Sequence, residues 1–310
     1  MNLDKILGIK YPIIQGGMAN ITDGKFAATV SEAGALGVIG AASMNGERLR
    51  REIRICKSLT QKPFAVNLML LNPYTEEMAK IVIEEEVPIV ITGAGNPSKY
   101  VDDWHKAKIK IFPVVANPTL AIRLEKQGVD GIIAEGNEAG GHIGEMTSMT
   151  LILQTCDKVK IPVIAAGGIA SGKQMLAAEV LGACGVQIGT LFLGSEECPI
   201  HSNYKDLLVN SRYNKVTVIG RTAGLPIRLL RNDMTNNYLR EEKAGKDKME
   251  LEHYTLGAMK KAVESGDLVN GSFMAGLTVT QIEDIKPVKE ILDTLMEEYH
   301  QEIEKIHAKF

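Results

Sequence analysis

Eight short apolar runs at nearly regular intervals constrain this chain more than any other feature of its sequence. They are Pro12–Gln15, Leu36–Gly40, Phe64–Leu68, Pro88–Thr92, Ile111–Val115, Gly131–Ala134, Pro162–Ala166 and Gly185–Ile188. Segments with helical periodicity lie between them, namely Glu47–Leu59, Thr75–Glu86, Pro118–Gln127, Ser148–Val159 and Ser171–Leu181. Strands that alternate with helices predict βα units around a parallel sheet. Eight units in about 190 residues favour an α/β fold of the closed (β/α)8 TIM-barrel type, with a doubly wound open sheet as the alternative.

Glycines follow most of these predicted strands. They are Gly16-Gly17, Gly40, Gly93, Gly136, Gly167-Gly168 and Gly189. In a parallel barrel the ends of all strands lie on one face, which is where active sites are built. Glycine lets the backbone turn sharply or approach a ligand closely. We therefore expect a binding site that is formed by these turns at the mouth of the barrel.

The richest of these turns runs from Ala134 to Gly144 and contains four glycines, two acidic residues and His142. Two interpretations are open at this point. The turn is either a surface loop with an incidental histidine, or a loop that fits a ligand and carries a side chain able to titrate near neutral pH.

The last two predicted strands are followed by Gly167-Gly168 and Gly189-Thr190. Many barrels bind phosphate at this position through backbone N–H groups. The segment from Gly167 to Gln174 nearly matches the phosphate-binding loop of nucleotide hydrolases, but Gln174 stands where that loop needs a hydroxyl. We instead expect Ser171 to be the N-cap of the following helix.

Three amide side chains lie within or at the ends of predicted strands, namely those of Gln15, Asn67 and Gln187. A buried amide needs hydrogen-bond partners, which are supplied by a neighbouring strand or loop, or by a planar heterocycle such as a flavin. Flavin sites often place a positive group near N1 of the ring. No Lys or Arg stands at a strand end, so the group that stabilises the reduced ring stays open.

The regular alternation ends after the eighth strand. We expect a barrel over residues 1–199, a cap over residues 200–255, and C-terminal helices over residues 256–310 that pack back on the barrel. The segment from His201 to Arg240 has a surplus of five positive charges in a chain whose net charge is −3. This segment is either a surface that meets an anionic carrier or cofactor, or a solvated face with scattered charges.

Composition excludes several classes of function. The net charge of −3 argues against general nucleic-acid binding. The four cysteines show no C-x-x-C spacing, which disfavours a zinc site or a disulfide framework and suits a reducing compartment. No signal peptide is visible, and no apolar run approaches the ~20 residues that span a bilayer. We expect a cytoplasmic protein without a metal site and without membrane insertion.

Several motifs in order along the chain resemble those of the nitronate monooxygenase superfamily of FMN-dependent barrels. They are Gln15–Ala19, Glu135–Gly144, Ile161–Ile169 and Gln187–Thr190. Within that superfamily the chain is most similar to the flavin-dependent enoyl-acyl-carrier-protein reductases of bacterial fatty-acid synthesis. The segments that carry this closer resemblance are Asn67–Leu71, Thr92–Tyr100 and Gly271–Gly276.

The resemblance implies FMN as the bound cofactor, NADH or NADPH as the reductant, and a 2-enoyl thioester of acyl carrier protein or coenzyme A as the substrate. It also implies a homodimer and raises the question of a monovalent cation. The residues expected to contact FMN are Gly17, Met18, Asn67, Glu135, Gly140, Gly141, Gly167, Gly168, Gln187, Gly189 and Thr190. His142 matches the histidine that lies beside the flavin in this family.

The implied chemistry passes a hydride from NAD(P)H to FMN and then to the β-carbon of the thioester. His142 is the candidate that polarises the thioester oxygen or donates the proton to the α-carbon, and its alternative role is purely structural. One rival function is a nitronate monooxygenase, in which His142 would act as a base. The other is a non-catalytic barrel that binds a flavin or a phosphate. Nicotinamide and acyl-chain preferences stay open.

Overall fold

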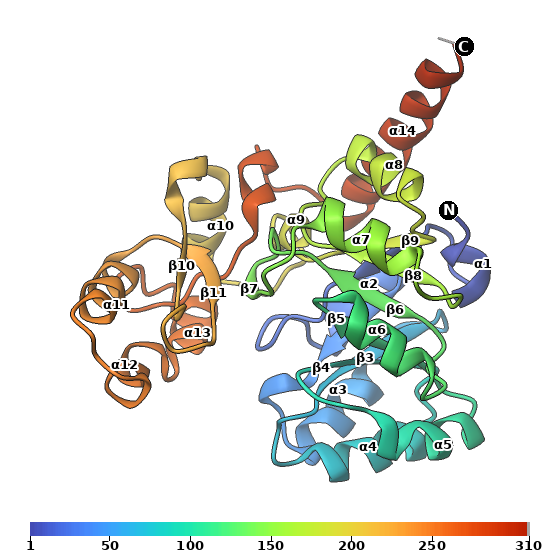
Figure 1. The fold of residues 1–310 in the computed structure, drawn as a ribbon, viewed down its shortest axis with the longest axis horizontal. Coiled ribbons are helices and arrows are strands. Elements are labelled where there is room, and N and C mark those ends of the chain that lie inside the picture. Colours follow the sequence, from blue (N-terminus) through green and yellow to red (C-terminus); the bar gives the residue numbers. More distant parts are fainter. Residues whose placement is uncertain (309–310) are drawn as a thin grey trace.

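Eight parallel strands form the centre of the structure, a computed structural model that describes residues 1–308 (Figure 1). They are β1 (Ile13–Gln15), β2 (Gly37–Gly40), β3 (Phe64–Met69), β4 (Ile89–Gly93), β5 (Lys110–Val115), β6 (Ile132–Glu135), β8 (Val163–Ala166) and β9 (Gly185–Ile188). Their order is β1-β9-β8-β6-β5-β4-β3-β2, and a parallel bridge between Ile14 and Leu36 joins the two ends. The sheet therefore closes on itself, and the predicted (β/α)8 barrel is confirmed.

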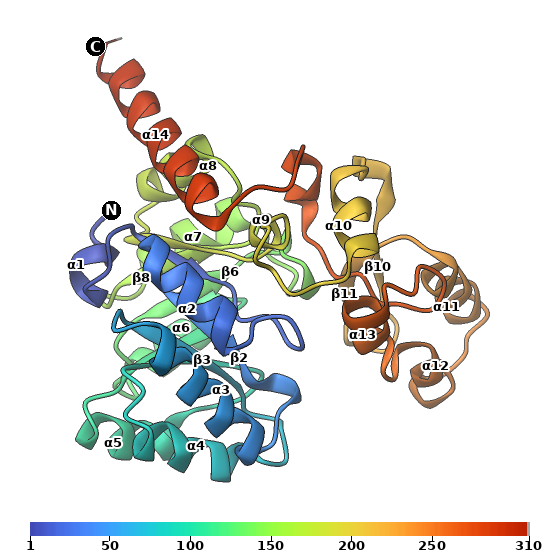
Figure 2. The same cartoon turned by 180° about the vertical axis from the view of Figure 1, so that it is seen from behind.

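One helix follows each barrel strand, and these helices surround the barrel (Figures 1 and 2). They are α2 (Gly24–Ala33), α3 (Gly46–Leu59), α4 (Thr75–Glu84), α5 (Ser98–Lys106), α6 (Pro118–Glu125), α7 (Ser148–Cys156), α8 (Gly172–Val180) and α9 (Thr190–Leu193). Ser171 caps α8 as predicted, because its hydroxyl accepts a hydrogen bond from the backbone N–H of Gln174. Helix α1 (Leu3–Leu7) places Leu3 and Leu7 against the apolar core inside the barrel.

The interior of the barrel is filled by one side chain in two along each strand, as strand geometry requires. Its members include Ile14, Val38, Ala65, Ile91, Phe112, Ile133 and Ile164. All of these side chains are almost fully buried. Each large apolar side chain stabilises the fold by about 1.5–3 kcal/mol relative to an exposed one. The lower part of the barrel is therefore a packed core, and its polar groups are left to the mouth.

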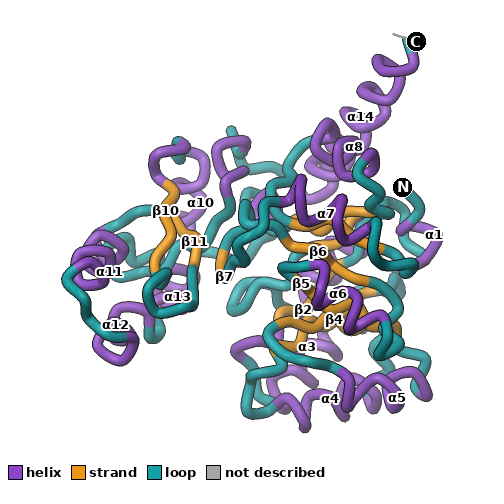
Figure 3. Tube along the Cα trace, in the orientation of Figure 1, coloured by secondary structure: helices purple, strands orange, loops and turns teal. Residues whose placement is uncertain are grey.

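A second unit lies beside the mouth and comprises mainly residues after β9 (Figure 3). Its elements are α10 (Ser202–Val209), β10 (Val216–Ile219), β11 (Ile227–Leu230), α11 (Asp233–Lys243), α12 (Lys248–Thr255) and α13 (Ala258–Lys260). Strands β10 and β11 are antiparallel, and β11 also pairs with β7 (Gly141–His142). This second unit, called the cap below, is therefore joined to the barrel by a three-stranded sheet that the sequence analysis did not predict.

The C-terminal segment divides between the cap and the barrel. Ala258 of α13 packs in the cap cluster of Ile219, Leu229, Met234, Tyr238 and Leu251, so the expected division after residue 255 separates α13 from its neighbours. Helix α14 (Val288–His307) lies along α8, and its last turns extend beyond the barrel (Figure 2). Within residues 1–308, no helix combines the length and the apolar character that crossing a membrane requires.

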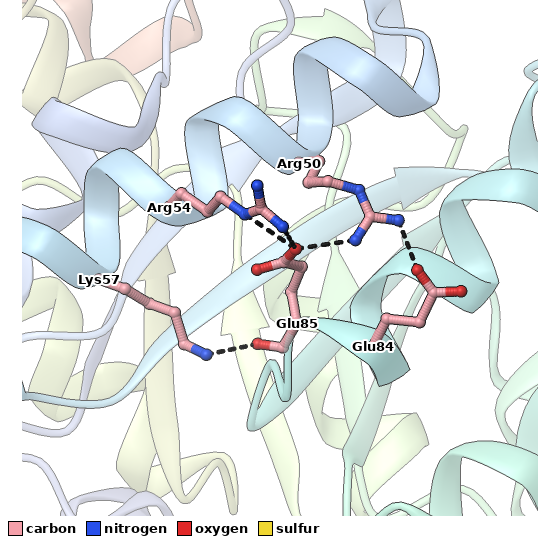
Figure 4. Close-up of polar contacts among 5 residues, drawn as sticks. All are labelled: Arg50, Arg54, Lys57, Glu84 and Glu85. Carbon is pink, nitrogen blue, oxygen red and sulfur yellow. Dashed lines mark hydrogen bonds and ion pairs between the residues drawn. The ribbon is translucent and has the colours of Figure 1, made fainter.

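An ion-pair network on the outside of the barrel ties α3 to the end of α4 (Figure 4). The carboxylate of Glu85 accepts hydrogen bonds from Arg50 (2.8 Å) and from Nε of Arg54 (3.0 Å). Lys57 donates to the backbone carbonyl of Glu85, and Arg50 also pairs with Glu84. The hydrogen bond from Arg54 is the main cause that lowers the pKa of Glu85 below its usual value.

We predict that Glu85→Gln lowers the free energy of unfolding at pH 7 by about 0.5–1 kcal/mol, because the network lies near solvent. A lowered pKa contributes stability that is present above the unfolded pKa of 4.5 and is lost as the pH falls through the folded pKa. Urea unfolding at pH 7 and pH 3 checks this, and the difference between variant and parent should be smaller at pH 3 than at pH 7. Glu84→Gln is the control, since that side chain is 54% exposed. A larger loss for Glu84→Gln would contradict the assignment.

Candidate functional site

Three polar side chains that the sequence analysis singled out share the inner face of the barrel at its mouth. Asn67 and Glu135 each follow a core residue, Ala65 and Ile133, by two positions on the same strand. Gln187 lies between two residues whose side chains point outward to the helices. Because side chains alternate along a strand, all three point into the barrel. A polar layer therefore lies above the apolar core.

The hydrogen bonds of this layer leave an acceptor unused. Asn67 Nδ2 donates to the backbone carbonyl of Gly17 (3.1 Å), which binds β3 to the loop after β1. Gln187 is 7% exposed, and its Oε1 has no hydrogen-bond partner among the described residues. An unsatisfied buried acceptor costs about 1–3 kcal/mol, so this position fits a ligand that presents an N–H group. The N–H edge of a flavin ring meets that requirement.

Gln15 lies outside this layer. Ile14 is the residue of β1 that points into the barrel, so Gln15 points outward, and its Oε1 accepts from the backbone N–H of Val38 (3.0 Å). The suggestion that Gln15 reads a ligand is therefore wrong. Its side chain instead links β1 to β2, where the barrel closes.

Glu135 is the titratable group of the polar layer. Part of the residue keeps contact with solvent at the mouth, yet the surrounding protein removes much of the hydration of its carboxyl group and raises the pKa of Glu135 to about 7. Burial disfavours the charged form of an acid because its hydration is lost. The carboxyl group is therefore able to hold a proton near neutral pH.

We predict that Glu135→Gln flattens the pH dependence of stability in flavin-free protein. A raised pKa means that the folded state binds the proton more tightly, so stability falls as the pH rises from the unfolded value of 4.5 to about 7. The expected fall is about 2–3 kcal/mol, at 1.36 kcal/mol for each pKa unit. Chemical denaturation between pH 5 and pH 8 measures it. An equal slope in parent and variant would show that Glu135 is ionised at low pH, as an exposed acid is.

The turns after the last two barrel strands form a backbone cradle. Gly167 and Gly168 have φ values of +83° and +77°, which L-residues with side chains rarely adopt. A Cβ atom on Gly167 would lie 2.7 Å from the carbonyl oxygen of Gly136, so this turn contacts the turn after β6. The side chain of Met18 approaches Gly189, and the N–H of Gly16 donates a hydrogen bond to the backbone carbonyl of Ile188. This arrangement suits the phosphate that the sequence analysis expected here.

His142 lies in a short strand, whereas the sequence analysis expected an irregular glycine-rich loop. It pairs with Ile227, and Gly141 pairs with Arg228, so β11 holds this segment in place. The His142 side chain is exposed, yet neighbouring protein removes part of its hydration and lowers its pKa. The ring is therefore mainly neutral at pH 7 and accessible for proton exchange.

Arg228 is a residue of the site that the sequence analysis missed. It is 5% exposed, and its two terminal nitrogens donate to the backbone carbonyl and to the Oδ1 of Asn137, both at 3.0 Å. Asn137 Nδ2 in turn donates to the carbonyl of Gly144 (2.6 Å). Burial lowers the pKa of Arg228. Arg228 of the cap therefore holds Asn137 at the start of the turn that carries His142, and Asn137 in turn holds Gly144 at its end.

A third segment completes the wall of the site. The N–H of Gly276 donates to the hydroxyl of Thr190 (2.9 Å), and the N–H of Leu277 donates to the carbonyl of Glu138 (3.0 Å). A Cβ atom on Gly140 would lie 2.6 Å from the carbonyl carbon of Ala275, so glycine is required for this approach. The expected ligand-contacting residues Gly140 and Thr190 are therefore also contact points between distant segments.

A metal site needs several ligating side chains close together. Among the described residues, no group of three or more His, Cys, Asp or Glu side chains is placed to hold a metal ion.

The family match of this closed (β/α)8 barrel, with its backbone cradle after the last strands and polar layer at the mouth, makes it an oxidoreductase of the flavoprotein class. The chain belongs to the nitronate monooxygenase family, whose sequence model matches residues 1–85 and 72–298.

Relatives and solved structures agree with this family. A probable nitronate monooxygenase from Staphylococcus saprophyticus is 33% identical over 325 aligned residues, which cover 84% of this chain and 92% of the relative. The structure of FabK from Thermotoga maritima is 42% identical, covers 99% of this chain and 98% of its own, and has a TM-score of 0.96. The structure of a nitroalkane oxidase from Streptomyces ansochromogenes is 25% identical and has a TM-score of 0.87. The match covers 98% of this chain and 99% of the oxidase chain.

Proposed function

We propose that this protein is an FMN-dependent enoyl-thioester reductase, which uses NADH or NADPH to reduce trans-2-enoyl groups in the last step of fatty-acid elongation. The observation that carries the proposal is an exposed His142 that the cap fixes on the segment directly after β6, the strand that contributes Glu135 to a polar layer with an unused buried acceptor. The sequence resemblance to flavin-dependent enoyl reductases and the similarity to FabK over nearly the whole chain support it.

The residues present fit FMN. Gln187 Oε1 and Asn67 would contact the ring, and the cradle of Gly167-Gly168 and Gly189-Thr190 would hold the phosphate. When bound, FMN supplies the hydride chemistry that joins the nicotinamide to the enoyl group.

His142 performs the protein's own chemistry in this proposal. Hydride addition at the β-carbon leaves charge on the thioester oxygen, which needs a hydrogen-bond donor, and leaves the α-carbon in need of a proton. His142 is exposed, and because loss of hydration lowers its pKa its ring is mainly neutral, with one N–H group that can donate to either atom. Arg228 keeps the strand that carries His142 in register with the cap.

The proposal also includes a cytoplasmic homodimer that accepts thioesters of an acidic carrier protein.

A steady-state assay with crotonyl-coenzyme A and either NADH or NADPH tests this function. We expect a yellow protein that, without oxygen, oxidises one nicotinamide cofactor over many turnovers only when the enoyl thioester is present, with butyryl thioester as the product. A flavin-loaded protein that leaves crotonyl thioester unchanged would refute the proposal.

A nitronate monooxygenase is the second candidate, because the matching family model and the staphylococcal relatives carry that name. In that case His142 would take a proton from a small nitroalkane, and O₂ would be the oxidant. Anaerobic addition of NADH or NADPH separates the two functions. Loss of the flavin absorbance band supports the reductase, whereas oxygen uptake with nitronates and no response to either nicotinamide supports the monooxygenase.

A further inference from the structure

An open pocket of about 570 Å³ lies at the mouth, away from the phosphate cradle. One wall is the 3₁₀ turn Ala41–Ser43 after β2 together with the start of α3, and the other is the segment from Met69 to Tyr74 after β3. Met69 follows Asn67 by two positions, so both side chains point to the inner face of the barrel. The pocket therefore adjoins the polar layer of the site described above.

The two walls are fixed to each other. Asn72 Nδ2 donates to the backbone carbonyls of Ala42 (3.1 Å) and Met44 (3.0 Å), and Asn72 Oδ1 accepts from the N–H of Tyr74 (2.8 Å). These bonds set the distance between the walls without any ligand. The pocket is preformed, as binding sites for small molecules usually are.

Arg48 brings an unpaired positive charge to this pocket. Its Nε is buried without a hydrogen-bond partner, and within residues 1–308 no ion pair involves its guanidinium. The other arginines of α3 differ: Arg50 and Arg54 are held by Glu84 and Glu85 (Figure 4), and Arg51 contacts Glu52. A guanidinium that is partly buried and lacks an acid partner favours an anionic ligand, above all a phosphate.

The remainder of the lining suits a flat, partly apolar group. Tyr74 is 50% exposed and Leu71 is 73% exposed at the rim, whereas Met44 is buried. Exposed apolar and aromatic side chains around one charged residue are typical of sites that bind a nucleotide base and its phosphate. The volume lies within the ~300–1,000 Å³ range of small-molecule sites.

We propose that this pocket binds the adenosine diphosphate end of NADPH or coenzyme A, each of which carries one further phosphate on the ribose, with Arg48 on that ribose phosphate and Tyr74 against the adenine. This inference rests on the proposed function, because a reductase of enoyl thioesters uses both classes of molecule. The pocket holds the non-reacting end of one of them, so that the reacting end is directed toward the layer of Asn67 and Gln187.

Calorimetry on the protein as purified tests the pocket without any turnover. The probes are 2′,5′-ADP, which carries the phosphate of NADPH, and 3′,5′-ADP, which carries that of coenzyme A. We expect one of them to bind with a micromolar Kd, and its identity names the source. Arg48→Gln should weaken that binding ~10–100-fold, as expected for the loss of one charged hydrogen-bond pair. Tyr74→Ala should weaken it about 10-fold through lost stacking.

Arg51→Gln is the matched control, because it removes the same charge from the same helix outside the pocket, and it should leave the Kd unchanged. Binding of neither probe at millimolar concentration would overturn the proposal. So would equal binding by the parent and Arg48→Gln, provided that their thermal unfolding curves coincide. Because the measurement needs no substrate, a failed assay with crotonyl thioester leaves its result intact.

Discussion

His142→Ala should slow the half-reaction with enoyl thioester by ~10²–10⁴-fold, which is the usual effect of removing a general acid. The half-reaction with NAD(P)H should stay within a few fold of the parent. The reason is the position of the side chain, which is exposed at the mouth on a strand that the cap holds by backbone hydrogen bonds. Substitution removes the ring, and the pairing of β7 with β11 uses backbone atoms that alanine keeps.

Anaerobic stopped-flow measurement of the flavin absorbance band separates the two half-reactions. A loss confined to the reaction with NAD(P)H would place His142 in the nicotinamide pocket. Equal losses in both, together with release of flavin, would give it a structural role. His300→Ala is the control, since this exposed histidine lies on α14 outside the barrel, and both of its rates should match the parent. An unchanged rate with enoyl thioester would remove His142 from catalysis.

The barrel and its polar layer were predictable because both follow from short stretches of sequence, namely apolar runs and the polar residues within or after them. Each barrel strand is a short apolar run, and closure at eight strands follows from their number. Asn67, Glu135 and Gln187 could be found as polar residues within or at the end of such runs. Gln15 satisfies the same rule but points outward, because its strand is only three residues long and its phase cannot be read from the sequence.

The sheet between cap and barrel was not predictable from local patterns. Gly141 and His142 have no strand propensity, and they form a strand because β11 lies beside them, 85 positions further along the chain. Part of the positive surplus of the cap also serves contacts that sequence patterns do not show. Arg228 is buried against Asn137, and Arg221 lies 3.9 Å from Glu145, so part of that charge acts within the molecule. The sequence did hold one sign that Arg228 is buried, because this arginine stands inside the apolar run from Ile227 to Leu230.

Arg228→Ala should reduce the turnover of enoyl thioester by about 10²-fold. The side chain makes two hydrogen bonds to Asn137, and bonds from a charged donor contribute about 1.5–3 kcal/mol each. Their loss leaves the carbonyl and the amide oxygen of Asn137 without partners beside Gly144 and frees the turn that carries His142. A loss of about 3 kcal/mol corresponds to ~10²-fold in the population of the ordered turn. The barrel core does not involve Arg228, so we expect the variant to fold and to keep its flavin.

Three further variants show whether Arg228 acts by positioning His142. Arg228→Lys keeps the charge but cannot reach both oxygens of Asn137 with a planar fork, so its turnover should lie between those of the parent and Arg228→Ala. Arg231→Ala removes an exposed arginine next to the end of the same strand and should stay within about two-fold of the parent. In the background of His142→Ala, the loss of Arg228 should have little additional effect on the rate with enoyl thioester, because residues that act as a unit are not additive. Additive losses in that double variant would show that Arg228 supports the site independently of His142.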